Sequence, residues 1–186
     1  RITTGQVIFE GRPRDFPFRE GNGKFELRAH TVDTVYRYLT GWEPIRQGEA
    51  DVSILGGDVR IIARGRIGAL KLDQFVVQTE IDGHGPDPGV RVSGRVSGAV
   101  NETLRLLREV KPGAGAWQAY LPDGLQASGD GVLMLTLHVP FGAPPVSILG
   151  DYQPLAANLS LPALRLGMEA VTGHMQFTET GVTAGA

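Results

Sequence analysis

Residues 131–138 read Gly-Val-Leu-Met-Leu-Thr-Leu-His, a glycine followed by side chains that alternate, with Leu133, Leu135 and Leu137 on one side. Alternation with a period of two predicts a β-strand that has one apolar and one polar face. The same cassette of a glycine and a short alternating run recurs at residues 5–11, 23–28, 48–57 and 173–178. The recurrence predicts a mainly β protein.

The alternating runs and the turns between them place the expected strands. We expect strands at residues 6–10, 24–38, 50–55, 59–63, 66–72, 74–81, 90–96, 125–127, 133–139, 146–149, 157–161, 171–177 and 182–184. Residues 24–38 are one strand, or two strands with a break near Thr31, because their β-branched and aromatic residues favour a strand over a short helix. The glycines of the 56–58 segment predict a tight hairpin, and the short links predict an antiparallel meander.

One segment has helical periodicity. Residues 100–110 place Val100, Leu104 and Leu107 on one side, Asn101 is a suitable N-cap, and the Pro-Gly pair at 112–113 ends the segment. We therefore expect one amphipathic helix of about three turns.

Composition excludes several classes of function. The 186 residues carry a net charge of -2 and no long basic run, which argues against a nucleic-acid partner. The absence of cysteine excludes disulfides, Cys-zinc sites and thiol nucleophiles. No apolar run approaches the roughly 20 residues of a membrane-spanning helix. Because the chain begins at Arg1 without a methionine and ends in strand-like sequence, we expect it to be a piece of a longer protein.

Catalytic motifs are missing from the sequence. The compact group Asp82, His84 and Asp87 could ligate a metal, but its glycines and prolines are equally typical of a turn, which we favour. No phosphate-binding loop and no nucleophile elbow occurs. The pairs Glu49 with Asp51 and Glu102 with Glu109 are best read as solvated faces. We expect no cofactor, no metal and no enzymatic activity.

The apolar rows of the strands leave two architectures open. Two sheets could cover each other in a closed sandwich. Alternatively, a long curved sheet could keep its concave apolar face open as a groove for a ligand such as an acyl chain. Both need the same alternation, so the pattern alone does not choose between them.

The order of several motifs resembles the YhdP branch of the AsmA-like proteins. They are Phe16-Pro17-Phe18, then residues 21–25, 33–38 and 41–44, the strand, turn and strand of 48–61, residues 93–98 before the helix, 129–137, and 171–179. Each motif is degenerate, and their order and spacing over nearly the whole chain carry the resemblance. Glu43 departs from the pattern, because it separates Trp42 from Pro44 where the family pattern has the two adjacent.

The resemblance implies a very long envelope protein that is anchored in the inner membrane of a diderm bacterium. Repeated β-groove units would form an apolar channel across the periplasm and move phospholipid between the inner and outer membranes, which maintains the outer-membrane barrier without catalysis. A loose internal repeat suggests two units here, residues 1–92 and residues 93–186, the second beginning with the helix, which would cover the groove. Only the parent protein, through parts outside this chain, would touch the membrane.

The expected partners are the acyl chains of phospholipids and the neighbouring β-groove units, which would pair with exposed strand edges at both ends. The residues we expect to face the groove and the lipid are Val52, Ile54, Phe75, Val77, Leu133, Leu135, Leu137, Met175 and Phe177. An alternative is a structural module that assists outer-membrane protein assembly through its strand edges. An enzyme acting on envelope glycans is a more distant third and requires two carboxylates that converge in a cleft.

Overall fold

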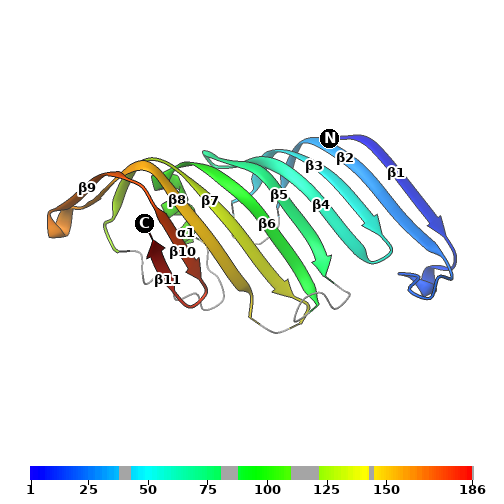
Figure 1. The fold of residues 1–186 in the computed structure, drawn as a ribbon. Coiled ribbons are helices and arrows are strands. Elements are labelled where there is room, and N and C mark those ends of the chain that lie inside the picture. Colours follow the sequence, from blue (N-terminus) through cyan, green and yellow to red (C-terminus); the bar gives the residue numbers. More distant parts are fainter. Residues whose placement is uncertain (38–42, 81–87, 110–121, 143–144, 186) are drawn as a thin grey trace.

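The computed structural model describes residues 1–37, 43–80, 88–109, 122–142 and 145–185. It contains one antiparallel sheet of eleven strands whose order follows the chain, so that each strand from β1 to β8 pairs with the next (Figure 1). After β8 the order continues with β10 and β11, while β9 pairs with β8. The predicted antiparallel meander is confirmed, and the sheet is not closed into a barrel.

The elements are β1 (Ile2–Glu10), β2 (Lys24–Tyr36), β3 (Ile45–Leu55), β4 (Asp58–Ile67), β5 (Leu70–Glu80), β6 (Gly89–Ala99), α1 (Val100–Glu109), β7 (Gln126–Pro140), β8 (Ser147–Leu161), β9 (Leu166–Val171), β10 (His174–Thr178) and β11 (Val182–Gly185), with short 3-10 turns at Pro13–Asp15 and Pro162–Leu164. The predicted turn at 56–58 joins β3 to β4. The predicted strand at 24–38 is one strand through Tyr36, with a register shift just after Thr31.

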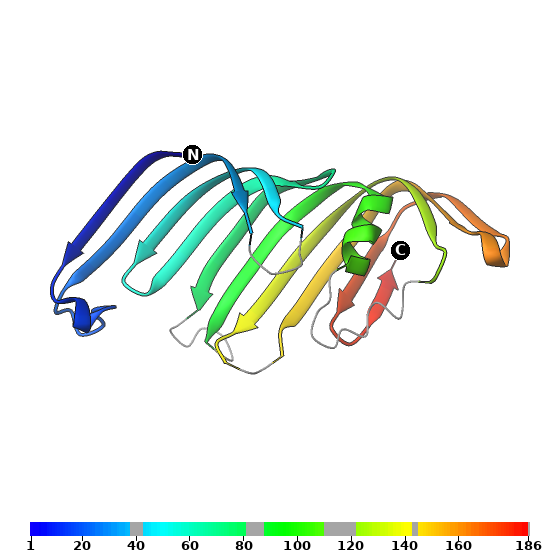
Figure 2. The same cartoon turned by 180° about the vertical axis from the view of Figure 1, so that it is seen from behind.

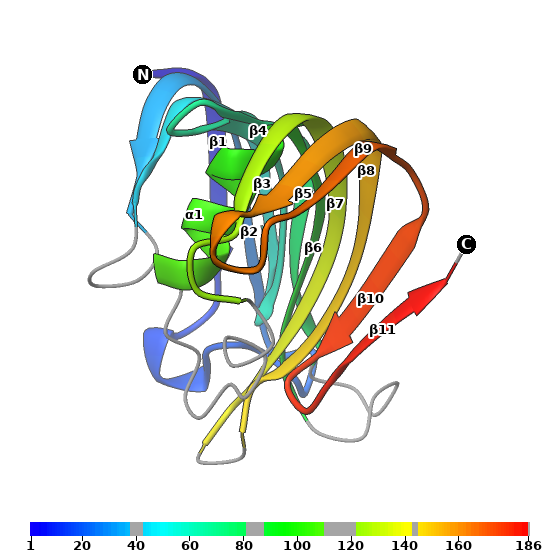
Figure 3. The same cartoon turned by 90° about the vertical axis from the view of Figure 1, so that its left-hand side faces the viewer.

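A series of β-bulges bends the long strands. Register shifts occur in most neighbouring pairings of the sheet, and Asp33, Gln47 and Ala156 lie at three of them with φ of 49°, 50° and 52°. A bulge adds a residue to one strand and bends it. As a result the sheet curves around α1, so that it has a concave and a convex face (Figure 3).

The helix α1 packs on the concave face against β6 and β7 (Figure 2). Its apolar side, Val100, Leu104 and Leu107, is buried, as the periodicity predicted. It begins at Val100, one residue before the expected N-cap Asn101. The expected end of the helix at 112–113 lies outside the described residues.

The helix shares one hydrophobic core with six strands, which include Ile67 of β4 and Phe177 of β10. Leu70 and Leu72 of β5, Val96 of β6, Leu133 of β7 and Tyr152 of β8 lie buried beneath α1. On its other side, Arg105 of α1 forms ion pairs of 3.1 Å with Glu102 and with Glu43, which precedes β3. These contacts attach the helix to strands and links far from it in sequence.

Several predicted strand boundaries are wrong because of single glycines. The expected strand at 66–72 is interrupted by a turn at Gly68, whose φ is 54°. The expected strand at 171–177 is divided between β9 and β10 at Gly173, whose φ is 134°. Glycine adopts these positive φ angles at little cost, and at both glycines the chain turns and the strand ends. Most of β9 was not predicted.

Two other boundaries are wrong in the opposite sense. The predicted strands at 125–127 and 133–139 form the single strand β7, and those at 146–149 and 157–161 form β8. In both cases a bulge, near Gly129 in β7 and near Ala156 in β8, shifts the alternation without ending the strand. When a bulge shifts the alternation of apolar and polar residues within one strand, the sequence therefore resembles two strands with a gap between them.

We predict that Leu133→Ala lowers the free energy of unfolding by about 2–5 kcal/mol, because it leaves a cavity in a packed core. Leu133 is 1% exposed beneath α1. The adjacent Met134 is 50% exposed on the other face, so Met134→Ala should change the value by less than about 0.5 kcal/mol. Urea denaturation followed by circular dichroism measures both, and equal losses would contradict the assignment of the two faces.

Candidate functional site

The register of the sheet assigns every strand residue to one face, because residues that are paired across antiparallel strands point to the same side. One concave row crosses seven strands as Ala29, Val52, Ile61, Val77, Val92, Leu137 and Ile148. The next row crosses eight strands as Thr31, Ala50, Ala63, Phe75, Gly94, Leu135, Gly150 and Phe177. These rows run across the strands, along the length of the sheet.

All nine residues that we expected to face a groove lie on this concave face. The two rows above contain Val52, Val77, Leu137, Phe75, Leu135 and Phe177. Leu133 and Met175 pair with Tyr152 in a third row. Ile54 pairs with Leu27 and Val59 in a fourth. Their role as lipid ligands stays a prediction.

The nine residues differ in how far the protein itself covers them. Leu133 and Phe177 are buried, and Leu133 lies directly under α1. The other seven are half-buried. The concave face is thus divided into a part that α1 covers, which is a packed core, and a part where the side chains remain accessible.

No charged side chain belongs to the paired concave rows of the described strands. Apart from the phenol of Tyr152, whose oxygen has no hydrogen-bond partner among the described residues, their polar groups are hydroxyls that bond to the protein. The Thr34 hydroxyl lies 2.9 Å from both the Tyr36 phenol oxygen and the Gly48 carbonyl oxygen, and Thr31 contacts the same phenol. In the next strand pair, the Val59 amide donates to the Thr79 hydroxyl at 2.8 Å. The face therefore offers an apolar ligand few groups that would lose water on contact.

Aromatic rings lie over glycines at four places on this face, an arrangement that sequence reasoning missed. A Cβ added to Gly94 would stand 2.2 Å from the ring of Phe75. The corresponding distances are 2.3 Å for Gly48 and Tyr36, 2.1 Å for Gly131 and Tyr152, and 2.1 Å for Gly150 and Phe177. A glycine inside a strand does mark a close approach of this kind. We expected Gly94 inside the strand at 90–96 without drawing this inference, and we left the other three glycines outside the expected strands.

The convex face carries paired charges instead. Arg91 donates to Glu80 through two nitrogens at 2.6 and 3.2 Å, and Arg64 donates to Glu49 at 2.6 and 3.0 Å. The hydrogen bond from Arg91, opposed by partial burial, lowers the pKa of Glu80. These charged pairs favour a convex face that stays in contact with solvent.

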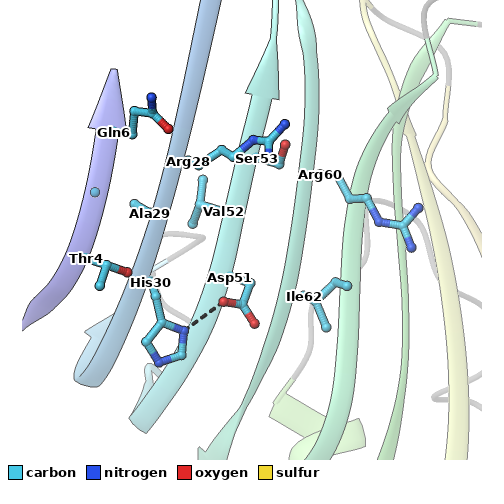
Figure 4. A pocket seen from close by; sticks show the side chains of 11 residues that line it. Thr4, Gln6, Arg28, Ala29, His30, Asp51, Val52, Ser53, Arg60 and Ile62 are labelled. Carbon is cyan, nitrogen blue, oxygen red and sulfur yellow. Dashed lines mark hydrogen bonds and ion pairs between the residues drawn. The ribbon is translucent and has the colours of Figure 1, made fainter. Parts of the chain in front are cut away.

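A shallow depression of about 500 Å³ lies on the convex side of β1–β4 (Figure 4). His30 and Asp51, whose Nδ1 and Oδ1 lie 2.7 Å apart, line it together with Gln6, Arg28 and Arg60. A second depression lies over β7–β9 and is also lined largely by polar residues. Of the nine expected groove residues, Val52 is in the first lining and none is in the second. Asp51 is the one carboxylate in the first lining, so this depression gives no support to a two-carboxylate glycosidase.

Two buried polar atoms lack a hydrogen-bond partner among the described residues, Nε2 of His138 and the phenol oxygen of Tyr152. Burial raises the pKa of Tyr152 to about 12, and the nearby Thr103 hydroxyl opposes this shift. His138 lies beside Glu80, with 4.0 Å between Nδ1 and Oε2.

The remaining sequence expectations fall partly outside the structure. Asp82, His84 and Asp87 are not among the described residues. Within the described ranges, no three His, Asp or Glu side chains gather closely enough to hold a metal ion. No helix in those ranges is long and apolar enough to cross a membrane.

Comparison with known proteins gives one match. A family model described as "YhdP protein" matches residues 1–186, the full length of the chain. No curated protein and no solved structure matches the chain.

Acidification provides a test of the convex-face ion pairs. Because the pKa of Glu80 is lowered in the folded state, its ionised form stabilises the fold above its unfolded pKa of about 4.5, and this contribution is lost as pH falls toward the folded pKa. We predict that Arg91→Gln lowers the urea midpoint of unfolding at pH 7. The difference in urea midpoint between this variant and the native protein should become smaller below about pH 4.5.

Arg60→Gln is the matched control. Arg60 also projects from the convex face, and in the described part of the chain it forms no ion pair within 4 Å. The difference in urea midpoint between Arg60→Gln and the native protein should stay constant over the same pH range. If the difference in urea midpoint for Arg91→Gln does not become smaller at low pH, the role assigned to the ion pair of Arg91 with Glu80 is contradicted.

Proposed function

The chain belongs to the YhdP family, a branch of the AsmA-like envelope proteins, and from this premise we propose that it is a lipid-conducting segment. In this proposal the segment stands in the periplasm, and the parent protein moves phospholipid between the inner and outer membranes to maintain the permeability barrier. YhdP is not a known enzyme family, and the proposed mechanism is non-catalytic.

The observation that carries the proposal is the uncharged concave face of an open sheet. Its rows continue from strand to strand, and the row through Val52, Val77 and Leu137 crosses seven strands. At about 4.8 Å between strands, such a row is about 29 Å long. An acyl chain that fills one leaflet of a bilayer spans about half of the 30 Å hydrocarbon core. One row is therefore long enough to cover a whole acyl chain.

The driving force is the transfer of methylene groups from water to the half-buried side chains of the face. Each CH₂ that is buried contributes about 0.8 kcal/mol. The head group stays in water at the open side of the curve, because the described concave rows contain no charge to bind it. Since the face has no single pocket, a chain can shift along the rows without crossing a charged group.

Continuity with neighbouring β-groove units is part of the proposal. Among the described strands, β1 pairs with β2 alone, and its other edge can therefore accept an added strand. At the other end of the sheet, β11 pairs with β10 alone within the same described residues. Strands added at these edges would extend the concave rows.

The free edge of β1 also supports the alternative function. It is nine residues long and almost wholly exposed, as a module that binds unfolded β-strands of outer-membrane proteins would require. A photo-reactive residue at Gln6, whose strand forms this edge, should then capture protein. A photo-reactive residue at Leu137 should capture lipid if the first proposal holds.

We predict that the double variant Leu135→Asp/Leu137→Asp abolishes co-purification of phospholipid, because each carboxylate would have to lose water against an acyl chain. Native mass spectrometry of the purified chain measures the bound lipid. The matched control is Met134→Asp/Thr136→Asp, which places the same charges on the same strand but on the convex face. The control should retain the lipid.

Two results would overturn the proposal. The first is a native chain that binds no phospholipid even when it is refolded with it, and the second is equal retention of lipid by both double variants. Circular dichroism of each variant shows that a loss of lipid does not follow from unfolding.

A further inference from the structure

We propose that the ring-over-glycine pair Phe75–Gly94 sets the clearance above the accessible part of the concave face and thereby admits ligands with two acyl chains. The similar pair Phe177–Gly150 is buried in the core and serves here as a geometric comparison. This inference rests on the proposed lipid-conducting function and makes Gly94 a positioning residue that acts through the ring of Phe75.

Both pairs lie in one row of the sheet, on either side of Leu135. Along this row Phe75, Gly94, Leu135, Gly150 and Phe177 alternate large and small side chains on five consecutive strands. Each glycine is the cross-strand partner of the phenylalanine that covers it. The two rings therefore lean from both sides toward Leu135. The side chains of these three residues cover the surface of all five positions in the row.

The close approach involves the body of each ring. A Cβ at Gly94 would lie 2.2 and 2.6 Å from Cδ2 and Cε2 of Phe75. At Gly150 it would lie 2.1, 2.4 and 2.5 Å from Cζ, Cε1 and Cε2 of Phe177. Carbon atoms that are not bonded to each other approach to about 3.5–4.0 Å, so neither ring could keep its position over an alanine.

The backbone does not require glycine at either position. Neither Gly94 nor Gly150 has a positive φ, in contrast to Gly68 and Gly173. Both lie inside regular pairings, where a glycine weakens the strand. The rings are thus the feature that accounts for glycine at these two places.

Adding a methyl group would move the ring in a predictable direction. The strand beneath Gly94 is held on both sides by the ladders to β5 and β7, so it cannot retreat. The ring of Phe75 must then rise from the sheet into the space above the concave face. A ligand with two acyl chains needs more of that space than a ligand with one.

The test compares two probes, a diacyl phosphatidylethanolamine and its one-chain lyso counterpart, by native mass spectrometry titration of the 186-residue chain. We expect Gly94→Ala to weaken diacyl binding by about tenfold or more and lyso binding by less than about threefold, the scale of overpacking a fitted site. The double variant Gly94→Ala/Phe75→Val should restore diacyl binding, because valine lacks the ring atoms that meet the new methyl group.

Gly131→Ala is the matched control, since its ring partner Tyr152 is buried under α1. It should lower the melting temperature and leave the ratio of diacyl to lyso binding unchanged. Phe75→Val alone gives a second measurement that does not depend on the folding of Gly94→Ala, and it should raise that ratio.

The outcomes separate this inference from the function on which it rests. A native chain that binds neither probe overturns the proposed function. If the native chain binds both probes, the inference alone is overturned when Gly94→Ala keeps the native ratio of diacyl to lyso binding, or when Gly94→Ala/Phe75→Val fails to restore diacyl binding.

Discussion

The cross-strand register is the constraint on which the rest of this structure depends. A slip of one residue in any pairing would turn the apolar side chains of that strand to the convex face and its charges to the concave face. The bulge at Asp73 illustrates how the register is kept. Leu72 and Phe75 both point to the concave face although they are three residues apart, because the extra residue between them restores the phase. The bulges thus bend the sheet and also keep its two faces chemically distinct.

The helix α1 divides the concave face into two environments. Under α1, Leu70, Leu133 and Tyr152 form a packed core that holds the fold together. Beyond it, the same rows continue with side chains that are only half-buried. In the proposed function, this half-buried apolar surface is the part that binds the ligand. The same rows of apolar side chains therefore stabilise the fold where α1 covers them, and they are available to the proposed ligand where it does not.

The alternation of side chains was sufficient to predict the sheet, the helix and the face on which all nine expected site residues lie. It could not predict where strands continue through a bulge, because the shift of phase near Gly129 or Ala156 resembles a turn. The alternation also could not distinguish the buried Leu133 from the half-buried Leu137, because the burial of Leu133 by α1 depends on contacts between segments that are distant in sequence. The glycines were ambiguous for a physical reason. Gly68 permits a positive φ and Gly94 lets a ring pass over the strand, yet the residue type is the same in both places.

An apolar face that conducts a ligand must not close on itself. Two flat sheets with such faces would pack about 10 Å apart as a sandwich and exclude any ligand. The bulges bend the described strands so that a second sheet of the same kind could not lie flat against the concave rows. The ion pairs of the convex face, such as Glu80 with Arg91, keep that side in water and oppose stacking from outside. The half-buried ring of Phe75 completes the arrangement, because it lies flat over Gly94 and adds apolar area to the face without filling the space above it.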